Sequence, residues 1–308
     1  MQRASKNVLY YTHSGANPPT MTVKPGEWFE VETQMNRGPD TVRVPEDIRE
    51  LYNQYRSDSQ PRDRGNAASG AIVVDGAEPG QIVTVHVGEI KTNPVGWTWY
   101  RGSTGAMPGY LGSSNIGEQF RIVHIKDDRI IWNDKLSFPV EPMMGVIGVA
   151  PARDEARHNG WAGEWGGNFD IQEVTNGAKV SIVVNVPGAM LHVGDMHARQ
   201  GDGEICGGGG IETGGVVKLM VELGPKPSEM TWPRIENDTH IMTTGQGKPA
   251  EDAFRIALSE MILWLEADYG MTQGEAYMFL SQCLEARVTQ FVNPSYSYVC
   301  KVNKKYLI

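Results

Sequence analysis

Glycine and proline interrupt this chain so often that short strands joined by turns are a better expectation than long helices. The 308 residues include 36 glycines and 18 prolines, about one residue in six, against roughly one in eight in ordinary globular chains. A Pro-Gly turn signal followed by a run of β-forming residues occurs twice, at 25–33 and at 79–87. Because glycine and proline both mark turns, the pattern predicts a β-rich fold.

Strand signals dominate residues 1–225. The run at 82–87 mixes apolar–polar alternation with nearly continuous apolar character, which is typical of a strand in a sandwich or barrel. The strands that we expect are Trp28–Thr33, Gln81–Val87, Ala178–Val186 and Gly215–Leu223. The polar stretch at 43–65 predicts a short exposed helix and a loop.

Helix signals are concentrated in residues 226–308. The range 249–268 places apolar side chains on one stripe of a helix, and Gly270 marks its end. Thr272 and Glu275 have the spacing of a capping box, in which each side chain accepts a hydrogen bond from the other residue's backbone N–H. The capping box predicts the start of a second helix.

These signals predict a fold class. It is mainly β, with sandwich- or barrel-like strands and a C-terminal α+β part that contains two helices. A last strand at 297–300 is expected to close the fold. We expect a mainly β region at 1–225 and an α+β region at 226–308, packed together as one unit.

Charge and cysteine content exclude several classes of function. Aspartate and glutamate outnumber lysine and arginine by 37 to 28, giving a net charge of −9, so nucleic-acid binding is not expected. The three cysteines do not suggest a disulfide framework, and no Cys-x-x-Cys pair suggests a thiolate zinc site. No secretory leader and no apolar run of about 20 residues is evident. We therefore expect a cytoplasmic protein with no membrane contact.

Chemistry is concentrated in the segment 191–206. Two histidines and three acidic residues occur there: His192, His197, Asp195, Asp202 and Glu204. Because side chains two residues apart share a face of an extended chain, Asp195 and His197 are expected to lie together. Asp202 and Glu204 have the same spacing, and glycines nearby allow the backbone to turn between the two pairs.

This segment favours a metal site over its alternatives. A single His–Asp pair is readily explained as a hydrogen bond without metal, and an acidic loop can also be solvated. Five such groups together are costly to bury unless a cation compensates. Histidine with carboxylates suits Zn²⁺ or a similar divalent ion. Two further acids are candidates to join this metal site: Asp170, which follows a tight glycine turn, and Glu212, which follows a glycine run.

Other residues suggest how a substrate could be held. The glycine run at 207–210 could let a substrate approach backbone N–H groups at Gly207 and Gly208, as in an oxyanion hole; a flexible hairpin loop explains the run equally well. Trp161 lies in a long loop, and loops with aromatic residues often shape a site. Cys206 could be a nucleophile activated by a histidine, although a small core residue is the simpler interpretation.

At this point the sequence resembles the acetamidase/formamidase family. The segments that carry the resemblance are 192–197, 200–204, 166–170, 76–80, 145–151, 232–234 and the two C-terminal helices. The resemblance implies a mainly β fold with an added α/β part. It also implies hydrolysis of a short primary amide, such as formamide or acetamide, to the acid and ammonia, with a divalent metal.

Site roles follow from this resemblance and from the charge of the residues. The expected metal ligands are His192, Asp195, His197 and Asp170. Glu204, or in its place Asp202, is expected to act as general base. The metal is expected to be zinc, with calcium or manganese as alternatives.

Two alternative functions remain open. One is hydrolysis of a larger or cyclic amide or a carbamate, with Trp97, Trp99 and Trp161 lining a roomier pocket. The other is a metal-stabilised binding protein without turnover. The expected partners are a small amide substrate and further copies of the chain, in a homodimer or larger homo-oligomer.

Overall fold

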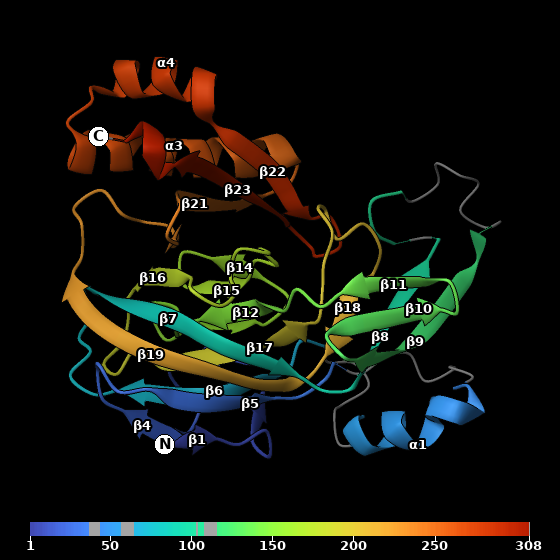
Figure 1. Cartoon of the computed structure of the whole chain (residues 1–308). Coiled ribbons are helices and arrows are strands. Elements are labelled where there is room, and N and C mark those ends of the chain that lie inside the picture. Colours follow the sequence, from blue (N-terminus) through green and yellow to red (C-terminus); the bar gives the residue numbers. More distant parts are fainter. Residues whose placement is uncertain (37–43, 57–64, 103, 108–115, 308) are drawn as a thin grey trace.

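The computed structural model describes residues 1–36, 44–56, 65–102, 104–107 and 116–307. Most of its regular structure is β-strand, arranged in two large sheets with helices after residue 249 (Figure 1). The predicted fold class is therefore confirmed. Among the described strands neither sheet closes into a barrel, so the sandwich alternative describes the architecture.

The first sheet has nine strands. Their order across the sheet is β1 (Arg3–Ala4), β5 (Phe29–Thr33), β19 (Gly215–Pro225), β7 (Gln81–Thr92), β16 (Lys179–Val183), β20 (Arg234–Glu236), β21 (His240–Gly247), β23 (Tyr296–Asn303) and β22 (Glu285–Gln290). The four long strands predicted from the sequence are β5, β7, β16 and β19. All four belong to this sheet, with boundaries that differ from the expected ones by at most five residues.

The second sheet has twelve strands. Nine follow one another in the order β11 (Leu136–Pro139), β10 (Arg129–Asn133), β9 (Glu118–Lys126), β8 (Val95–Arg101), β18 (Gly208–Thr213), β17 (Leu191–His197), β12 (Met143–Gly148), β15 (Gly166–Asn168) and β14 (Ala162–Gly163). The other three are β6 (Ala68–Val74), which pairs with β17, and its neighbours β2 (Leu9–Tyr10) and β4 (Met21–Val23). A separate pair consists of β3 (Thr12–Ser14) and β13 (Ala156–His158).

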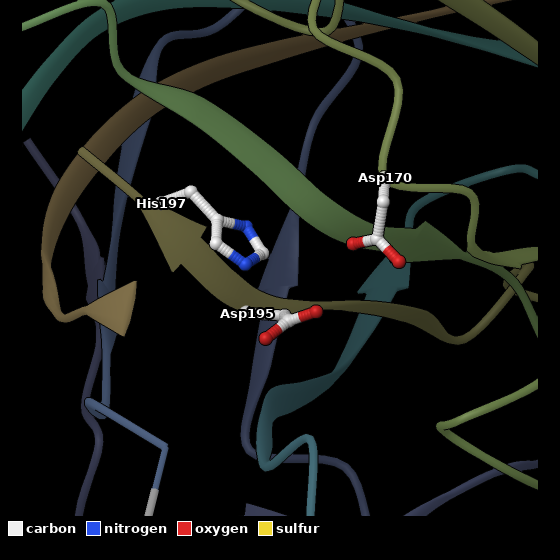
Figure 2. A group of neighbouring side chains, drawn as sticks. All are labelled: Asp170, Asp195 and His197. Carbon is white, nitrogen blue, oxygen red and sulfur yellow. The ribbon is translucent and has the colours of Figure 1, made fainter. Parts of the chain in front are cut away.

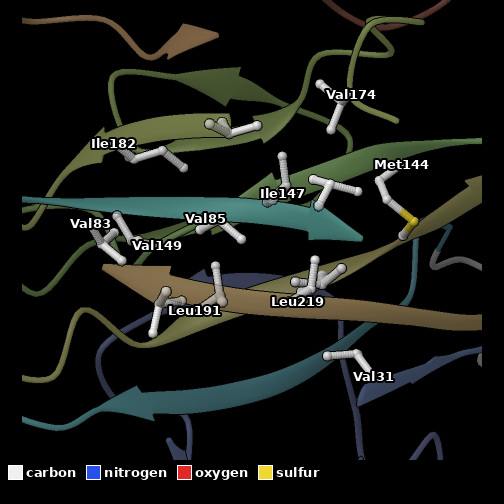
Figure 3. Close-up of a cluster of buried hydrophobic side chains, with 14 of the residues drawn as sticks. Val31, Val83, Val85, Met144, Ile147, Val149, Val174, Ile182, Leu191 and Leu219 are labelled. Carbon is white, nitrogen blue, oxygen red and sulfur yellow. The ribbon is translucent and has the colours of Figure 1, made fainter. Parts of the chain in front are cut away.

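The main hydrophobic core lies between these two sheets. Alternate residues of β7, including Val83 and Val85, are fully buried, as period-two alternation requires. They share one cluster with Leu219 of β19 and with Ile147 and Leu191 of the other sheet (Figure 3). The β-branched residues that the sequence places at alternate positions therefore hold the two sheets face to face.

The C-terminal helices cover strands of the first sheet. They are α3 (Ala250–Tyr269) and α4 (Gln273–Cys283), which lie together beyond β21, β22 and β23 (Figure 1). Gly270 ends α3 in the left-handed conformation, and Thr272 and Glu275 form the predicted capping box. A short 3₁₀ turn, η1 (Lys304–Tyr306), follows β23.

Residues 226–308 are joined to the rest of the chain through the sheet itself. Strand β20 pairs with β16, so the strands after residue 225 continue the nine-stranded sheet. The division at residue 225 stays a prediction, and it falls inside a continuous sheet. No helix in the described ranges is long and apolar enough to cross a membrane.

The polar stretch at 43–65 differs from the expectation. Its described part contains α1 (Glu46–Tyr55), and the remaining residues lie largely outside the described ranges. The helix is not simply exposed, because Ile48 and Tyr52, one turn apart, are buried against a cluster with Trp97. The i, i+4 spacing of these two residues is the signal that the composition of the stretch obscured.

Candidate active site

A buried cluster of acidic side chains and one histidine is built around β17. Asp170, Asp195 and His197 point toward one another (Figure 2), and each offers a ligand atom within 4.8 Å of the other two. A second group shares His197 and adds Glu204 and Glu212, again within 4.8 Å. The His197 Nε2 atom lies 3.3 Å from Glu212 Oε1 and 4.0 Å from Glu204 Oε1. All five side chains are buried.

Strand geometry explains how the cluster forms. Asp195 and His197 are two residues apart on β17 and share a face. Glu212 is paired directly with His197 in the β17–β18 ladder, so their side chains are cross-strand neighbours. Asp170 follows β15, on the other side of β12 from β17. The sequence analysis expected Asp170 as a ligand and identified Glu212 only as a candidate to join, and the sheet brings both into the cluster.

Glycines create the space that the cluster occupies. A Cβ at Gly145, on β12 between Asp170 and Asp195, would come within 2.6 Å of Asp195 Oδ2. Gly209 and Gly210 play the same part for Glu204 and His197, because a Cβ there would lie 2.6 Å from Glu204 Cγ and 2.5 Å from His197 Cδ2.

The backbone of three acidic residues is in the left-handed region. The φ angles are 49° at Asp170, 56° at Asp195 and 37° at Glu204. Residues other than glycine seldom adopt this conformation, and such strain gathers at functional sites. The strain therefore supports the view that the fold is adapted to hold these carboxylates together.

Asparagine side chains from distant segments orient the carboxylates. The Asn36 amide donates to Asp195, and also to Glu212 Oε2 at 3.0 Å. Asn66 donates to Asp195 Oδ2 at 3.1 Å, and Asn293 donates to Asp170 Oδ2 at 2.9 Å. Sequence reasoning missed all three asparagines, because nothing local distinguishes them from turn residues.

The electrostatics of the cluster indicate a deficit of positive charge. Burial raises the pKa of Asp195 well above its usual value, and the charge of Glu212 raises it further. Burial also raises the pKa of Glu204, with the charge of Asp170 acting in the same direction. Burial by itself would lower the pKa of His197, but the facing carboxylates, led by Glu212, raise it to about 10. A cation would offset this accumulation of negative charge.

The cluster fits a divalent metal ion. Asp170 Oδ1, Glu204 Oε2 and His197 Nδ1 are buried and have no hydrogen-bond partner among the described residues. Carboxylate oxygens with one imidazole form a donor set that suits Zn²⁺ or Mn²⁺, and the excess of oxygen also suits Ca²⁺. Metal binding is thus possible here, and the donor set leaves the identity of the metal open.

His192, an expected ligand, belongs to neither of the two groups that the described residues form. Its side chain lies on the same side of β17 as that of His197, away from the core that Leu191, Val193 and Met196 join, but at the other end of the strand. There its Nδ1–H donates to the Met190 carbonyl at 2.9 Å, and Nε2 accepts from the Asn17 amide at 2.8 Å. Burial lowers the pKa of His192 to about 4.

Asp202, the alternative base, also lies apart from the cluster. Its side chain is 71% exposed and is paired with Arg287 at 2.9 Å. The glycine at 203 has a φ of 83°, and the turn there separates the exposed Asp202 from the buried Glu204. Of the two candidates for a base, only Glu204 lies in the buried cluster with His197 and Glu212.

The expected substrate-binding residues Gly207, Gly208 and Trp161 are not among the described ligand groups, and their substrate contacts stay a prediction. A Cβ at Gly207 would come within 2.6 Å of the Trp99 ring, and one at Gly208 within 2.5 Å of the Trp97 ring. These two glycines therefore make room for indoles. Trp161 is exposed and lines a separate cavity.

Cys206 does not have the surroundings of a nucleophile. Burial raises the pKa of its thiol, and the groups that lower it are Thr98 and the Gly208 backbone. No histidine is among those influences, whereas an activated thiol needs a base or a cation beside it. The structure therefore favours the interpretation of Cys206 as a packing residue.

Fold and site together define a class: a two-sheet β protein with a C-terminal helix pair and a buried carboxylate–histidine cluster of metal-site character. A model of the Acetamidase/Formamidase family matches residues 152–302. The solved acetamidase from Bacillus halodurans is 29% identical, with a TM-score of 0.87 over 99% of this chain and 98% of that one. The acetamidase from Yersinia enterocolitica is 30% identical, with a TM-score of 0.84 over 97% and 90%.

A further relative matches over a short segment. The acetamidase of Mycolicibacterium smegmatis is 50% identical over 60 residues, which span 20% of this chain and 15% of that protein. The near-complete overlap with the Yersinia acetamidase establishes kinship along the chain. The chain belongs to the acetamidase/formamidase family.

Proposed function

We propose that this protein hydrolyses a short-chain primary amide, of the size of formamide or acetamide, to the carboxylic acid and ammonia with the help of a divalent metal ion. The observation that carries the proposal is the convergence of Asp170, Asp195, His197, Glu204 and Glu212 in one buried cluster. Family membership supports the amide as substrate. The excess of carboxylates supports the metal.

Asp170, Asp195 and His197 are the residues that would hold the ion, because their ligand atoms converge and two of them have an unpartnered atom. Glu212 faces His197 Nε2 and fixes the imidazole, or takes a ligand position of its own. A bound divalent ion supplies a Lewis acid for the amide carbonyl and makes a water molecule more acidic. The amides of Asn36 and Asn293 donate to Asp195 and Asp170 and so keep these two carboxylates oriented.

Glu204 is the residue that we propose as general base. Its carboxyl group is buried, and Oε2 has no partner within the described part of the chain. From this position it would take the proton of the attacking water and pass it to the departing nitrogen, which leaves as ammonia. Asp202, exposed and paired with Arg287, is not placed to do so.

The test is ammonia release from formamide, acetamide and propionamide by the purified protein, before and after chelation, with metal content determined by elemental analysis. We expect release that disappears on chelation and returns with one of Zn²⁺, Mn²⁺ or Ca²⁺. Undiminished release from metal-free protein would contradict the metal-dependent mechanism. Tightly bound metal without release from any of the three amides would contradict the short-amide substrate.

The structure does not strengthen the alternative of a larger amide. Trp97 is buried, donates from Nε1 to the Asn36 carbonyl at 2.9 Å and stacks on Phe120. It is therefore part of the core and not of a pocket wall. Zinc as the metal, a homodimer and a cytoplasmic location stay predictions from the sequence.

A further inference from the structure

A cavity of about 510 Å³ lies between the loop at 151–165 and the C-terminal region. Three indoles line it: Trp161 and Trp165 from the loop and Trp232 from the segment before β20. None of the five residues of the carboxylate–histidine cluster is among its described lining residues. The volume is in the range of small-molecule sites, so the cavity is a candidate for a second binding site.

Two buried hydrogen-bond donors on the wall of this cavity have no acceptor. Gln246 of β21 is only 7% exposed, and its Oε1 accepts from the backbone N–H of Ala162 at 3.0 Å. That bond fixes the orientation of the amide, so the free atom is the donor Nε2. Nε2 of Gln246 and Nε1 of Trp165 are both buried without a partner among the described residues. Native structures keep few such donors.

The charged residues of the lining balance. Arg157 donates to Glu155 at 2.8 Å and lies over the Trp165 ring, with its guanidinium carbon 5.5 Å from the ring centre. Arg153 and Glu164 are the other charged groups among the described lining residues, which gives two positive and two negative groups. The cavity therefore selects by shape and by its free donors more than by net charge.

We propose that this cavity binds a small planar molecule that carries a carbonyl or carboxylate oxygen. The oxygen accepts hydrogen bonds from Gln246 and Trp165, and the planar body lies against the indoles. Both donors belong to residues that line the cavity, and the bound ligand would reach each N–H after a small side-chain movement that keeps the bond from the Ala162 N–H to Gln246 Oε1. An amide and a carboxylic acid share this chemistry, so both are tested.

The experiment is calorimetric titration of the full-length protein with benzoate and, separately, with benzamide. Gln246→Glu keeps the acceptor for Ala162 but replaces the free donor with an oxygen. At mildly alkaline pH, where the new carboxyl group is ionised, we expect benzoate binding to weaken at least about tenfold. Benzamide binding should weaken less, because no ligand charge is repelled.

Trp165→Phe keeps an aromatic ring and removes the other donor, so it should weaken both ligands by about threefold to tenfold. Trp132→Phe is the matched control, because Trp132 lies on β10 and is not a lining residue. Three results would overturn the proposal. They are no binding of either ligand, equal binding by the Gln246, Trp165 and Trp132 variants, and binding lost in Asp195→Asn but kept in Gln246→Glu. The last would place the ligand in the carboxylate–histidine cluster.

Discussion

The two histidines of β17 have opposite electrostatic surroundings on one strand. His192 and His197 are five residues apart, and both are fully buried in the twelve-stranded sheet. His197 faces carboxylates, and its pKa is raised to about 10. His192 faces the Met190 carbonyl, the Asn17 amide and the His13 ring, and burial lowers its pKa to about 4.

The difference shows that burial by itself does not make a histidine functional. Leu191, Val193 and Met196 all join the main core, so the left-handed backbone at Asp195 shifts the alternation, and both histidines leave β17 on the side away from that core. Around His197, β18 and the segment after β15 contribute acids, so its imidazole joins a set of metal-binding groups. Around His192, at the other end of the strand, the partners are neutral, and the imidazole is an uncharged structural group. The partners on the neighbouring strands and loops therefore decide the role of each imidazole.

The largest effect is expected from Glu204 in the carboxylate–histidine cluster. Glu204→Gln keeps the size and hydrogen-bonding capacity of the side chain but cannot accept the proton of water. We expect turnover to fall by about a thousandfold, with metal content unchanged by elemental analysis. Asp202→Asn is the matched control and should retain turnover within about twofold, because Asp202 is exposed. Full activity of Glu204→Gln would exclude Glu204 as the base.

Exchanging each histidine for glutamine tests the comparison directly. His197→Gln should lower metal affinity and turnover by at least about a hundredfold, because it removes the one nitrogen ligand of the cluster. His192→Gln should leave metal stoichiometry unchanged and turnover within about threefold. Metal titration and ammonia release measure both variants. Loss of metal from His192→Gln alone would restore His192 as a ligand.

The lowered pKa of His192 predicts a pH-dependent stability. Its folded pKa of about 4 lies below the ordinary value of 6.5, so the unfolded chain takes up the proton first as the pH falls. The contribution of neutral His192 to the free energy of unfolding is present above pH 6.5 and is lost as the pH falls toward 4. Between pH 6.5 and about pH 5 the wild type should lose ~2 kcal/mol through this residue.

His192→Gln removes this titrating group. Urea unfolding of the wild type and the variant at the two pH values, both metal-free, measures the difference. Between these two pH values, we expect the free energy of unfolding of the variant to fall by ~2 kcal/mol less than that of the wild type. Parallel losses in the two proteins would show that His192 is not held neutral by the fold.

Much of the fold could be predicted from local signals. The capping box of Thr272 and Glu275, the end of α3 at Gly270 and the alternating strands all depend on neighbours within a few residues. The sequence pattern also placed Asp195 and His197 on one face, because the period of a strand is two. No local signal excluded His192, because its separation from the cluster depends on the distant segments that pack around it.

Long-range pairing decided the rest of the site. Asn293 is 123 residues from Asp170, and Asn36 is 159 residues from Asp195. The Gln200 amide ties the Asp170 carbonyl to that of Thr289, so β22 of the C-terminal region helps to hold a proposed ligand.

The sequence by itself therefore determined the β-rich class, the helix ends and the segment that carries the chemistry, because each follows from local backbone and side-chain preferences. Only the tertiary structure decided which acids share one cavity with His197. It also showed that Gly209 and Gly210 make room for Glu204 and His197. The physical reason is that strand register and sheet packing, set by burial over the whole chain, bring together residues that no local pattern connects.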